Sequence, residues 1–244
     1  MRRTIRQSKQ NMSQVNVYYN YYVPKNPRRA CEVLSCMGVM LDDPNITRMI
    51  VLAEPSEIHE PSELVYWKVE RRPLVADYFA AAAFHSGADD VNVIINSDCF
   101  ICPSTTAKLK KTPAGEAYCL SRRDMKSLVP YRINWAEERA KRPVRYAMQD
   151  AWVFRGPPRP GMWLEFPLGK PGCDSRLAHE LQEVGYRISD PFRRLRVCHY
   201  HVSAERTWSY DDRVPPPYVN PPKSWDQRVV DKCIGVAKKL CGLQ

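Results

Sequence analysis

Residues 91–100 read VNVIINSDCF, an apolar run that stops at the polar triplet Asn96-Ser97-Asp98. A short apolar run of this kind, rich in β-branched residues, predicts a buried strand. The chain before it predicts strands at 15–22, 47–53 and 64–69, together with helices that begin at Pro27 and Leu74. Strands and helices that alternate in this way favour an α/β fold, in which helices flank a mostly parallel central sheet.

The end of this apolar strand is also the first place where we expect chemistry. In open α/β sheets, ligands bind at the carboxyl ends of the strands, so the loops after Tyr22, Glu54, Val69 and Ile95 are of interest. Asp98 lies in the last of these loops, where a carboxylate is well placed to hold a divalent cation against a phosphate. The alternative interpretation is that Asp98 caps a turn or a helix.

The rest of the chain is less regular. It predicts strands at 117–121, 151–154 and 195–202 and a helix at 175–184 that ends before Gly185. We therefore expect a basic tail at 1–14 and one domain at 15–203. A Pro-rich linker at 204–225 and an amphipathic C-terminal helix at 226–244 complete the expected organisation.

The composition favours a polyanionic partner. Among the 244 residues, 37 Lys and Arg outnumber 27 Asp and Glu, and the net charge is +10. Such a balance favours nucleic acid, anionic lipid or a phosphate-bearing substrate. Residues 122–145 concentrate this charge, with eight cations and three acids. The sequence shows no secretory signal and no apolar run long enough to span a membrane, and its nine cysteines are irregularly spaced. We therefore expect reduced thiols and a cytoplasmic location.

Several catalytic signatures are absent from the sequence: the nucleophile elbow, the Gly-rich phosphate loop, the dinucleotide fingerprint and the zincin motif. Cys99 and Cys102 form a lone C-x-x-C pair, which is more typical of packing than of a zinc site. Asp174 precedes a predicted helix, where it either caps the helix or takes part in chemistry. His199 and His201 lie two apart in a predicted strand and so share one face, where they either pack or bind a metal.

Two of these segments resemble the nucleotide-sugar-dependent glycosyltransferases of the GT-A fold, in particular the inverting group with DXD and ED motifs. Asn96-Ser97-Asp98 is similar to DXD, with Asn96 in place of the first Asp. Cys173-Asp174 is similar to ED, with Cys173 in place of the Glu, and residues 185–188 match the G-Y-x-I strand that follows. The resemblance covers about residues 15–203 and implies a GT-A-like fold.

The same resemblance implies a metal-dependent reaction. Asp98 would be a metal ligand, together with His199 or His201, and Asp174 would be the general base. The expected cation is Mn²⁺ or Mg²⁺, with a lean toward Mn²⁺ because imidazole joins the ligands. A metal would neutralise the charge that develops on the leaving diphosphate, and one-step attack by an acceptor hydroxyl would invert the anomeric centre.

Other residues are candidates for holding the donor, expected to be a UDP-sugar, or the acceptor. The donor candidates are Asn20, Glu54, Arg71, Arg72 and Asn96; the two arginines are alternatively solvated surface charges. The acceptor candidates are Asp150, Trp152, Arg139, Lys141 and Arg142. Asp150 is alternatively a structural carboxylate, and the last three alternatively keep a surface helix solvated. Trp135 and Trp163 are further aromatic residues that suit stacking on a base or a sugar.

The acceptor itself is predicted from charge and from a narrower resemblance. Asn96 to Phe100, Gln149 to Trp152 and Pro171 to Arg176 resemble motifs of a viral and bacterial subgroup of these transferases. A basic surface and a need for a hydroxyl favour DNA that carries hydroxymethylated pyrimidines, as in modified bacteriophage genomes within the host cytoplasm. The alternatives are a bacterial surface glycan as the acceptor, a glycoside hydrolase, and a non-catalytic nucleic-acid-binding module on the same fold.

Overall fold

The computed structural model describes residues 13–58, 64–125, 148–203, 205 and 208–223. Most of the predicted basic tail and the predicted C-terminal helix lie outside these residues. So do Trp135, Arg139, Lys141 and Arg142. Within the described part of the chain, no helix is both long enough and apolar enough to cross a membrane.

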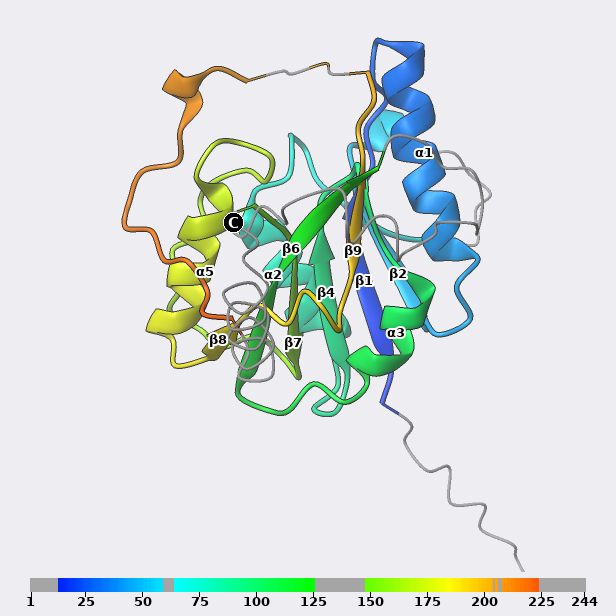
Figure 1. Cartoon of the computed structure of the whole chain (residues 1–244). Coiled ribbons are helices and arrows are strands. Elements are labelled where there is room, and N and C mark those ends of the chain that lie inside the picture. The colour runs from blue at the N-terminus through cyan, green and yellow to red at the C-terminus, as the bar shows by residue number, and fades with distance from the viewer. Residues whose placement is uncertain (1–12, 59–63, 126–147, 204, 206–207, 224–244) are drawn as a thin grey trace, which may run out of the picture.

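A nine-stranded sheet forms the centre of the described chain (Figure 1). Its path is β3-β2-β1-β4-β7-β6-β9-β5, and β8 pairs with β6 beside this path. Five pairings are parallel, namely β1 with β2 and β4, β2 with β3, and β6 with β8 and β9. Three are antiparallel, namely β4 with β7, β6 with β7, and β5 with β9. The predicted α/β class with a mostly parallel sheet is therefore confirmed. The strands are β1 (Val15–Asn20), β2 (Arg48–Ala53), β3 (Val65–Lys68), β4 (Val91–Ile95), β5 (Cys99–Ile101), β6 (Glu116–Met125), β7 (Gln149–Arg155), β8 (Arg187–Ser189) and β9 (Val197–Tyr200).

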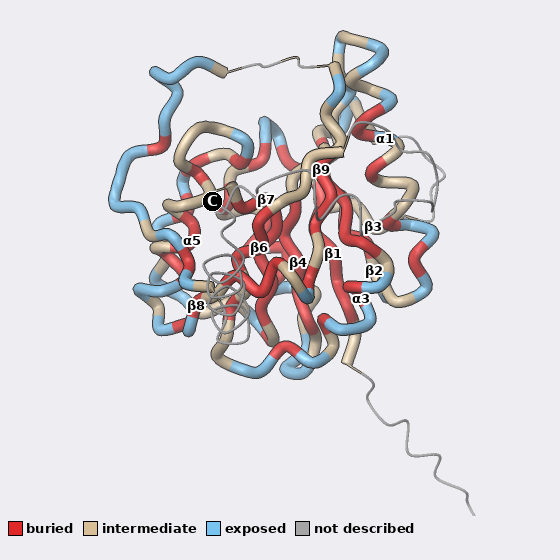
Figure 2. Tube along the Cα trace, viewed as in Figure 1, coloured by how far each residue is buried: buried red, intermediate tan, exposed pale blue. Residues whose placement is uncertain are grey.

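Among the described residues, four helices cover the two faces of the sheet: α1 (Pro27–Leu41), α2 (Val75–His85), α3 (Pro103–Leu109) and α5 (Cys173–Glu183). Two short 3₁₀ turns, η1 (Pro55–Glu57) and η2 (Tyr210–Asp212), lie in connections. Successive residues of β1 point to opposite faces, as strand geometry requires. Val17 and Tyr19 therefore pack in one core with α1, while Tyr18 packs in the other with α2 and α5. Figure 2 shows the buried strands between these partly exposed helices.

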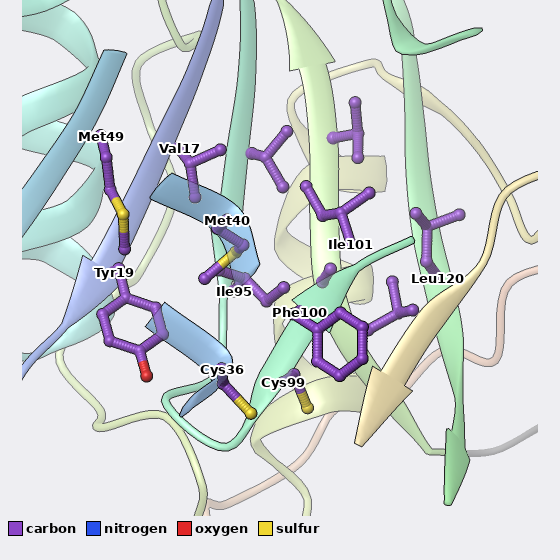
Figure 3. Packing of buried hydrophobic residues seen from close by; sticks show 14 of the residues in the cluster. Val17, Tyr19, Cys36, Met40, Met49, Ile95, Cys99, Phe100, Ile101 and Leu120 are labelled. Atoms are coloured by element: carbon purple, nitrogen blue, oxygen red, sulfur yellow. The ribbon is translucent and has the colours of Figure 1, made fainter. Parts of the chain in front are cut away.

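Helix α1 begins just after β1 and packs on the sheet beside the predicted site. The Asn26 side chain caps it by accepting the backbone N–H of Arg28 at 2.9 Å, and Pro27 occupies the first turn, where no N–H is needed. Cys36 and Met40 lie on its buried face. Figure 3 shows these side chains in the same core as Tyr19 of β1 and Cys99 of β5.

Part of the stretch predicted as a Pro-rich linker lies against the start of α5. The backbone N–H of Val214 donates to the Pro171 carbonyl at 2.9 Å, and that of Val219 donates to the Ser175 carbonyl at 3.0 Å. Val214 is buried in the core that contains α5. Residues 214–219 are therefore held against the start of α5, close to Asp174.

Among the described strands and α-helices, β5 and α3 were not predicted from the sequence. Strand β5 has three residues, too few for a periodic pattern, and α3 begins at Pro103 directly after it. The predicted strand at 195–202 is shorter in the structure, where β9 ends at Tyr200. The pairing of β5 with β9 nevertheless brings the two predicted metal-binding segments together.

Candidate functional site

The turn after β4 places Asp98 directly before Cys99, the first residue of β5. Because β5 and β9 are antiparallel partners, Cys99 lies opposite His199. The backbone N–H of Tyr200 donates to the Asp98 carbonyl at 2.8 Å and extends this pairing by one step. The register therefore places Asp98 between His199 and His201, whose side chains share one face of the chain.

The side chains of these three residues converge on one oxygen atom. Oδ2 of Asp98 lies 3.2 Å from Nε2 of His199 and 3.4 Å from Nδ1 of His201. One nitrogen or oxygen of each residue lies within 4.8 Å of the others, a separation that a single metal ion can bridge. The sequence offered His199 and His201 as alternatives, whereas the structure brings both imidazoles to Asp98.

Asp124 holds His199 from the other side of its ring. Strands β6 and β9 are parallel partners in which Asp124 lies opposite His199, and Oδ1 of Asp124 is 2.8 Å from Nδ1 of His199. A neutral His199 that donates Nδ1–H to Asp124 presents its Nε2 lone pair to the site, which is the usual arrangement of a metal-bound imidazole. In the sequence, Asp124 is only one acid within a basic stretch.

Neighbouring charges and hydrogen bonds shift the pKa values of the residues at this site. Burial alone would raise the pKa of Asp98, but hydrogen bonds from His199 and His201 and the charge of Arg29 hold it well below its usual range. Burial alone would lower the pKa of His199, but its bonds to Asp124 and Asp98 outweigh burial and raise it to about 9. At neutral pH these shifts favour an ionised Asp98 beside a protonated His199.

This donor set fits a divalent cation. A carboxylate oxygen and two imidazoles are common ligands of Mn²⁺ and Zn²⁺, and a cation would supply the positive charge that protons supply in the metal-free protein. Nε2 of His201 is buried without a hydrogen-bond partner among the described residues. This nitrogen lies across the ring from Nδ1, which faces Asp98, so it would not bind the same cation.

Two residues of α1 complete this side of the site and were missed by the sequence analysis. Nη2 of Arg29 lies 2.8 Å from Oδ2 of Asp98, and Nη1 lies 2.9 Å from Oε2 of Glu32. Glu32 in turn accepts the backbone N–H groups of Val202 and Ser203, directly after His201. The only sequence signal for Arg29 was its place in the first turn of the helix that follows β1, near the carboxyl edge of the sheet.

A second group of charges extends from the metal ligands across the sheet. Nη1 of Arg122 lies 3.0 Å from Oδ2 of Asp150, and its Nε lies 3.2 Å from Oδ1 of Asp124. The Asn96 side chain donates to the other oxygen of Asp150, and the Asn96 backbone N–H donates to the Asp150 carbonyl. Both carboxylate oxygens of Asp150 therefore have protein partners, and Asn96 and Asp150 lie side by side near Asp98.

Asp174 occupies the first turn of α5, after Gly172, whose φ of 81° suits glycine. Burial raises the pKa of Asp174 to about 6, and the charge of Asp150 adds to that rise. Asp150 also contributes to the raised pKa of His199, so it lies within electrostatic range of both residues. Burial raises the pKa of the neighbouring Cys173 thiol to about 12, and Cys173 therefore packs as a neutral core residue.

The remaining donor candidates lie at strand ends or in the connection before α2, with partners of their own. The Asn20 side chain donates to the carbonyls of Tyr21 and Leu52 at 3.1 Å. The Glu54 backbone N–H donates to Glu57 within η1. Arg71 pairs with Asp77 at 2.6 Å, and Arg72 donates to the Leu168 carbonyl at 2.9 Å. In the described part of the chain, neither arginine forms an ion pair with Asp98.

Two of the tryptophans proposed for stacking, Trp152 and Trp163, lie within the described residues and differ in exposure. Trp152 is 0% exposed and packs in the core beside α2 and α5. Its ring offers no face on which an acceptor could stack, so the structure assigns Trp152 to packing. Trp163 is partly exposed, and the guanidinium carbon of Arg176 lies 4.4 Å from its ring centroid.

Comparison with known proteins gives structural likeness only. No protein-family model and no curated protein matches the sequence. Among solved structures, the Pyrobaculum calidifontis mannosyltransferase in complex with GDP-Man and Mn²⁺ is 15% identical, with a TM-score of 0.49 over 82% of this chain and 59% of that chain. GalNAc-T7 with UDP, GalNAc and Mn²⁺ is 11% identical, with a TM-score of 0.49 over 86% of this chain and 46% of that chain.

A 2-C-methyl-D-erythritol 4-phosphate cytidylyltransferase from Francisella tularensis is 12% identical, with a TM-score of 0.32 over 64% of this chain and 71% of that chain. The present chain spans about half the length of the two transferases it resembles. Likeness at this level establishes neither a family nor an activity. The fold class therefore rests on the strand order, and the candidate site rests on its own geometry.

Proposed function

We propose that the protein is a metal-dependent glycosyltransferase that moves a sugar from a nucleotide-sugar donor to an acceptor hydroxyl. One observation carries this proposal: Asp98, His199 and His201 converge on one point beside the carboxyl end of β4. This edge of an α/β sheet is where phosphate-bearing ligands bind. A glycoside hydrolase needs two carboxylates but neither a metal nor a nucleotide, so this cluster favours the transferase.

Asp98, His199 and His201 would hold the cation, and Asp124 would orient His199. Two imidazoles beside one carboxylate favour Mn²⁺ over Mg²⁺, which prefers oxygen ligands. When bound, the cation would stabilise the negative charge of the leaving nucleoside diphosphate. The side chains of the chain itself would bind the donor, orient the acceptor and accept its proton.

Asp174 would be the base that accepts the acceptor proton. Its pKa of about 6 leaves it ionised at neutral pH while keeping it basic enough to take a proton from a hydroxyl in the transition state. Direct attack with Asp174 as the base would invert the anomeric centre. The neutral Cys173 beside it would take no part in this proton transfer.

The donor would lie along the ends of β1, β2 and β4. Asn20, Glu54 and Asn96 follow or end these strands and would contact the base or ribose of a UDP-sugar. Arg71 would bind the diphosphate only after breaking its ion pair with Asp77, and Arg72 only after giving up its hydrogen bond to the Leu168 carbonyl. Asp150 would contact the sugar or acceptor only after it gave up its hydrogen bond with Asn96 or its ion pair with Arg122.

The acceptor we propose is DNA that carries hydroxymethylated pyrimidines. The net charge of +10 and the excess of cations in residues 122–145, most of which lie outside the described residues, support a polyanion. A bacterial surface glycan is the alternative acceptor, and a non-catalytic DNA-binding module is the alternative without turnover.

A panel of nucleotide sugars with Mn²⁺ tests the proposal. Purified protein should release nucleoside diphosphate from at least one donor and should stop when EDTA removes the metal. Hydroxymethylated duplex DNA and a surface glycan, supplied separately, distinguish the two acceptors. Turnover of a simple glycoside without nucleotide or metal would instead show a hydrolase, and DNA binding without any donor turnover would show the non-catalytic module.

A further inference from the structure

Arg29 is held at the site by three groups. Its Nη2 lies 2.8 Å from Oδ2 of Asp98, its Nη1 lies 2.9 Å from Oε2 of Glu32, and its Nε donates to the Tyr22 hydroxyl at 3.3 Å. The side chain is 12% exposed. The guanidinium is therefore almost enclosed beside the metal ligands, where a positive charge would be expected to oppose a bound cation.

Arg29 and a metal ion would compete for the same atom. Oδ2 of Asp98 is the oxygen that His199 and His201 also approach. A cation bound to this oxygen would lie next to the guanidinium of Arg29, and the two positive charges would repel each other. Metal binding should therefore favour a position in which Nη2 of Arg29 has turned away from Asp98.

Glu32 lets Arg29 turn without leaving the site. Glu32 is 1% exposed, and Oε1 accepts the backbone N–H of Val202 at 2.7 Å and that of Ser203. The Ser203 hydroxyl donates to Oε2 at 3.0 Å. These bonds fix Glu32 independently of Asp98, so the pair between Glu32 and Nη1 of Arg29 can act as a pivot while Nη2 changes its partner.

We propose that Arg29 is a diphosphate-binding residue that neutralises Asp98 in the metal-free protein and turns to the nucleotide when the metal binds. This inference rests on the proposed function, because the diphosphate of a nucleotide sugar is the anion that would lie beside the metal. A guanidinium binds phosphate oxygens through paired N–H groups. The displaced Nη2 would thus gain an anionic partner in place of the carboxylate it lost.

Arg122 is the contrasting arginine at the same site. It pairs with Asp150 at 3.0 Å and with Asp124 at 3.2 Å, and neither of these is one of the three grouped ligands. A bound cation would leave both of its partners in place. Arg29 is therefore the arginine whose contact changes when the metal binds.

Metal and nucleotide affinities of Arg29→Gln test the proposal, because they should change in opposite directions. Titration calorimetry measures the binding of Mn²⁺ alone to metal-free protein, and then of UDP and GDP to protein saturated with Mn²⁺. We expect Arg29→Gln to bind Mn²⁺ alone about fivefold more tightly or better, since the competing cation is gone. We expect it to bind the nucleoside diphosphate about tenfold more weakly, since a charged hydrogen-bond donor is lost.

Two further variants control for folding and for charge. Arg28→Gln removes the same charge from an exposed position in the same turn of α1 and should change neither affinity. Arg29→Lys keeps the charge but loses the fork that spans Asp98 and Glu32, so it should bind Mn²⁺ like the wild type and the nucleotide more weakly. If Arg29→Gln does not fold, Arg29→Lys carries the nucleotide arm of the test.

The outcomes separate this inference from the proposed function. If wild-type protein binds a nucleoside diphosphate with Mn²⁺ but Arg29→Gln binds both ligands as the wild type does, Arg29 is structural and the inference is overturned. A fall in Mn²⁺ affinity in Arg29→Gln would overturn it as well. If wild-type protein binds neither UDP nor GDP in the presence of Mn²⁺, the proposed function fails and the inference fails with it.

Discussion

Nε2 of His199 lies 3.2 Å from Oδ2 of Asp98, although 101 residues separate them along the chain. A three-residue strand makes this contact possible, because β5 pairs with β9 and sets Cys99 opposite His199. A shift of one residue in that register would turn His199 and His201 to the other face. The metal site that we propose thus depends on the pairing of β5 and β9.

Replacing any of the three proposed metal ligands should weaken Mn²⁺ binding. We expect Asp98→Asn to abolish Mn²⁺ binding and donor turnover, because the amide lacks the negative charge on which both imidazoles converge. His199→Ala and His201→Ala should each weaken Mn²⁺ binding, and His199→Ala more strongly because Asp124 orients that ring. Mn²⁺ should raise the melting temperature of the wild type but not of Asp98→Asn. Small and equal effects of both histidine variants would indicate that the rings only pack.

Asp124 is expected to act through His199. Asp124→Ala should weaken Mn²⁺ binding about 10- to 100-fold, which is the usual cost of losing the group that orients a metal-bound imidazole. Asp124→Asn should recover part of this loss, because its carbonyl oxygen can accept the same hydrogen bond from Nδ1 of His199. Manganese titration followed by electron paramagnetic resonance measures both. Equal losses in the two variants would show that charge rather than orientation matters at this position.

The pH dependence of transfer should follow Asp174. Its pKa is raised to about 6, and a general base must be ionised, so transfer should rise with pH through about 6 and level off above it. Asp174→Asn should lower the transfer rate about 10²- to 10⁴-fold while Mn²⁺ and nucleotide still bind. Rate profiles at saturating donor and acceptor measure this. Loss of donor binding in Asp174→Asn would assign the residue a different role and make Asp150 the next candidate base.

Asp190 provides a stability prediction away from the site. It is 2% exposed, it accepts hydrogen bonds from the Ser121 backbone and hydroxyl, and burial raises its pKa from 3.8 to about 6. The folded protein therefore holds this proton more tightly than the unfolded chain does. The contribution of Asp190 to the free energy of unfolding should fall as pH rises from about 4 to about 6, by about 3 kcal/mol at most.

Urea unfolding across this pH range measures the effect. Asp190→Asn cannot ionise, so it should remove that part of the pH dependence, whereas the exposed Asp89→Asn should leave it intact. An unchanged slope in Asp190→Asn would show that Asp190 does not carry its proton in the folded state at pH 5.

The strands and helices with strong patterns could be predicted from the sequence, and so could three residues of the candidate site. The apolar strand at 91–95 ends at Asp98 because parallel strands deliver polar loops to one edge of the sheet. Because side chains alternate along a strand, the sequence predicted that His199 and His201 share one face. The resemblance to GT-A transferases then connected these residues, and the structure brings them together.

What the sequence could not supply depends on tertiary packing. Arg29 and Glu32 look like ordinary charges on an amphipathic helix, and only the packing of α1 against β5 and the end of β9 brings Arg29 to Asp98 and Glu32 to Val202. Asp124 carries no local signal, because its role follows from the register of β6 with β9. Trp152 was misjudged as an acceptor residue because a strand that is buried on both faces hides aromatic side chains on either side.

Donor turnover as a function of Mn²⁺ is the measurement that tests the central claim most directly. The wild type should release nucleoside diphosphate from a nucleotide sugar. The control variant Asp89→Asn should do the same, because Asp89 is exposed and precedes β4, at the end of that strand away from Asp98. This release should saturate with Mn²⁺ and vanish with EDTA, whereas Asp98→Asn should show none at any Mn²⁺ concentration. Metal-independent turnover by the wild type, or Mn²⁺-dependent turnover by Asp98→Asn equal to that of the wild type, would contradict the account.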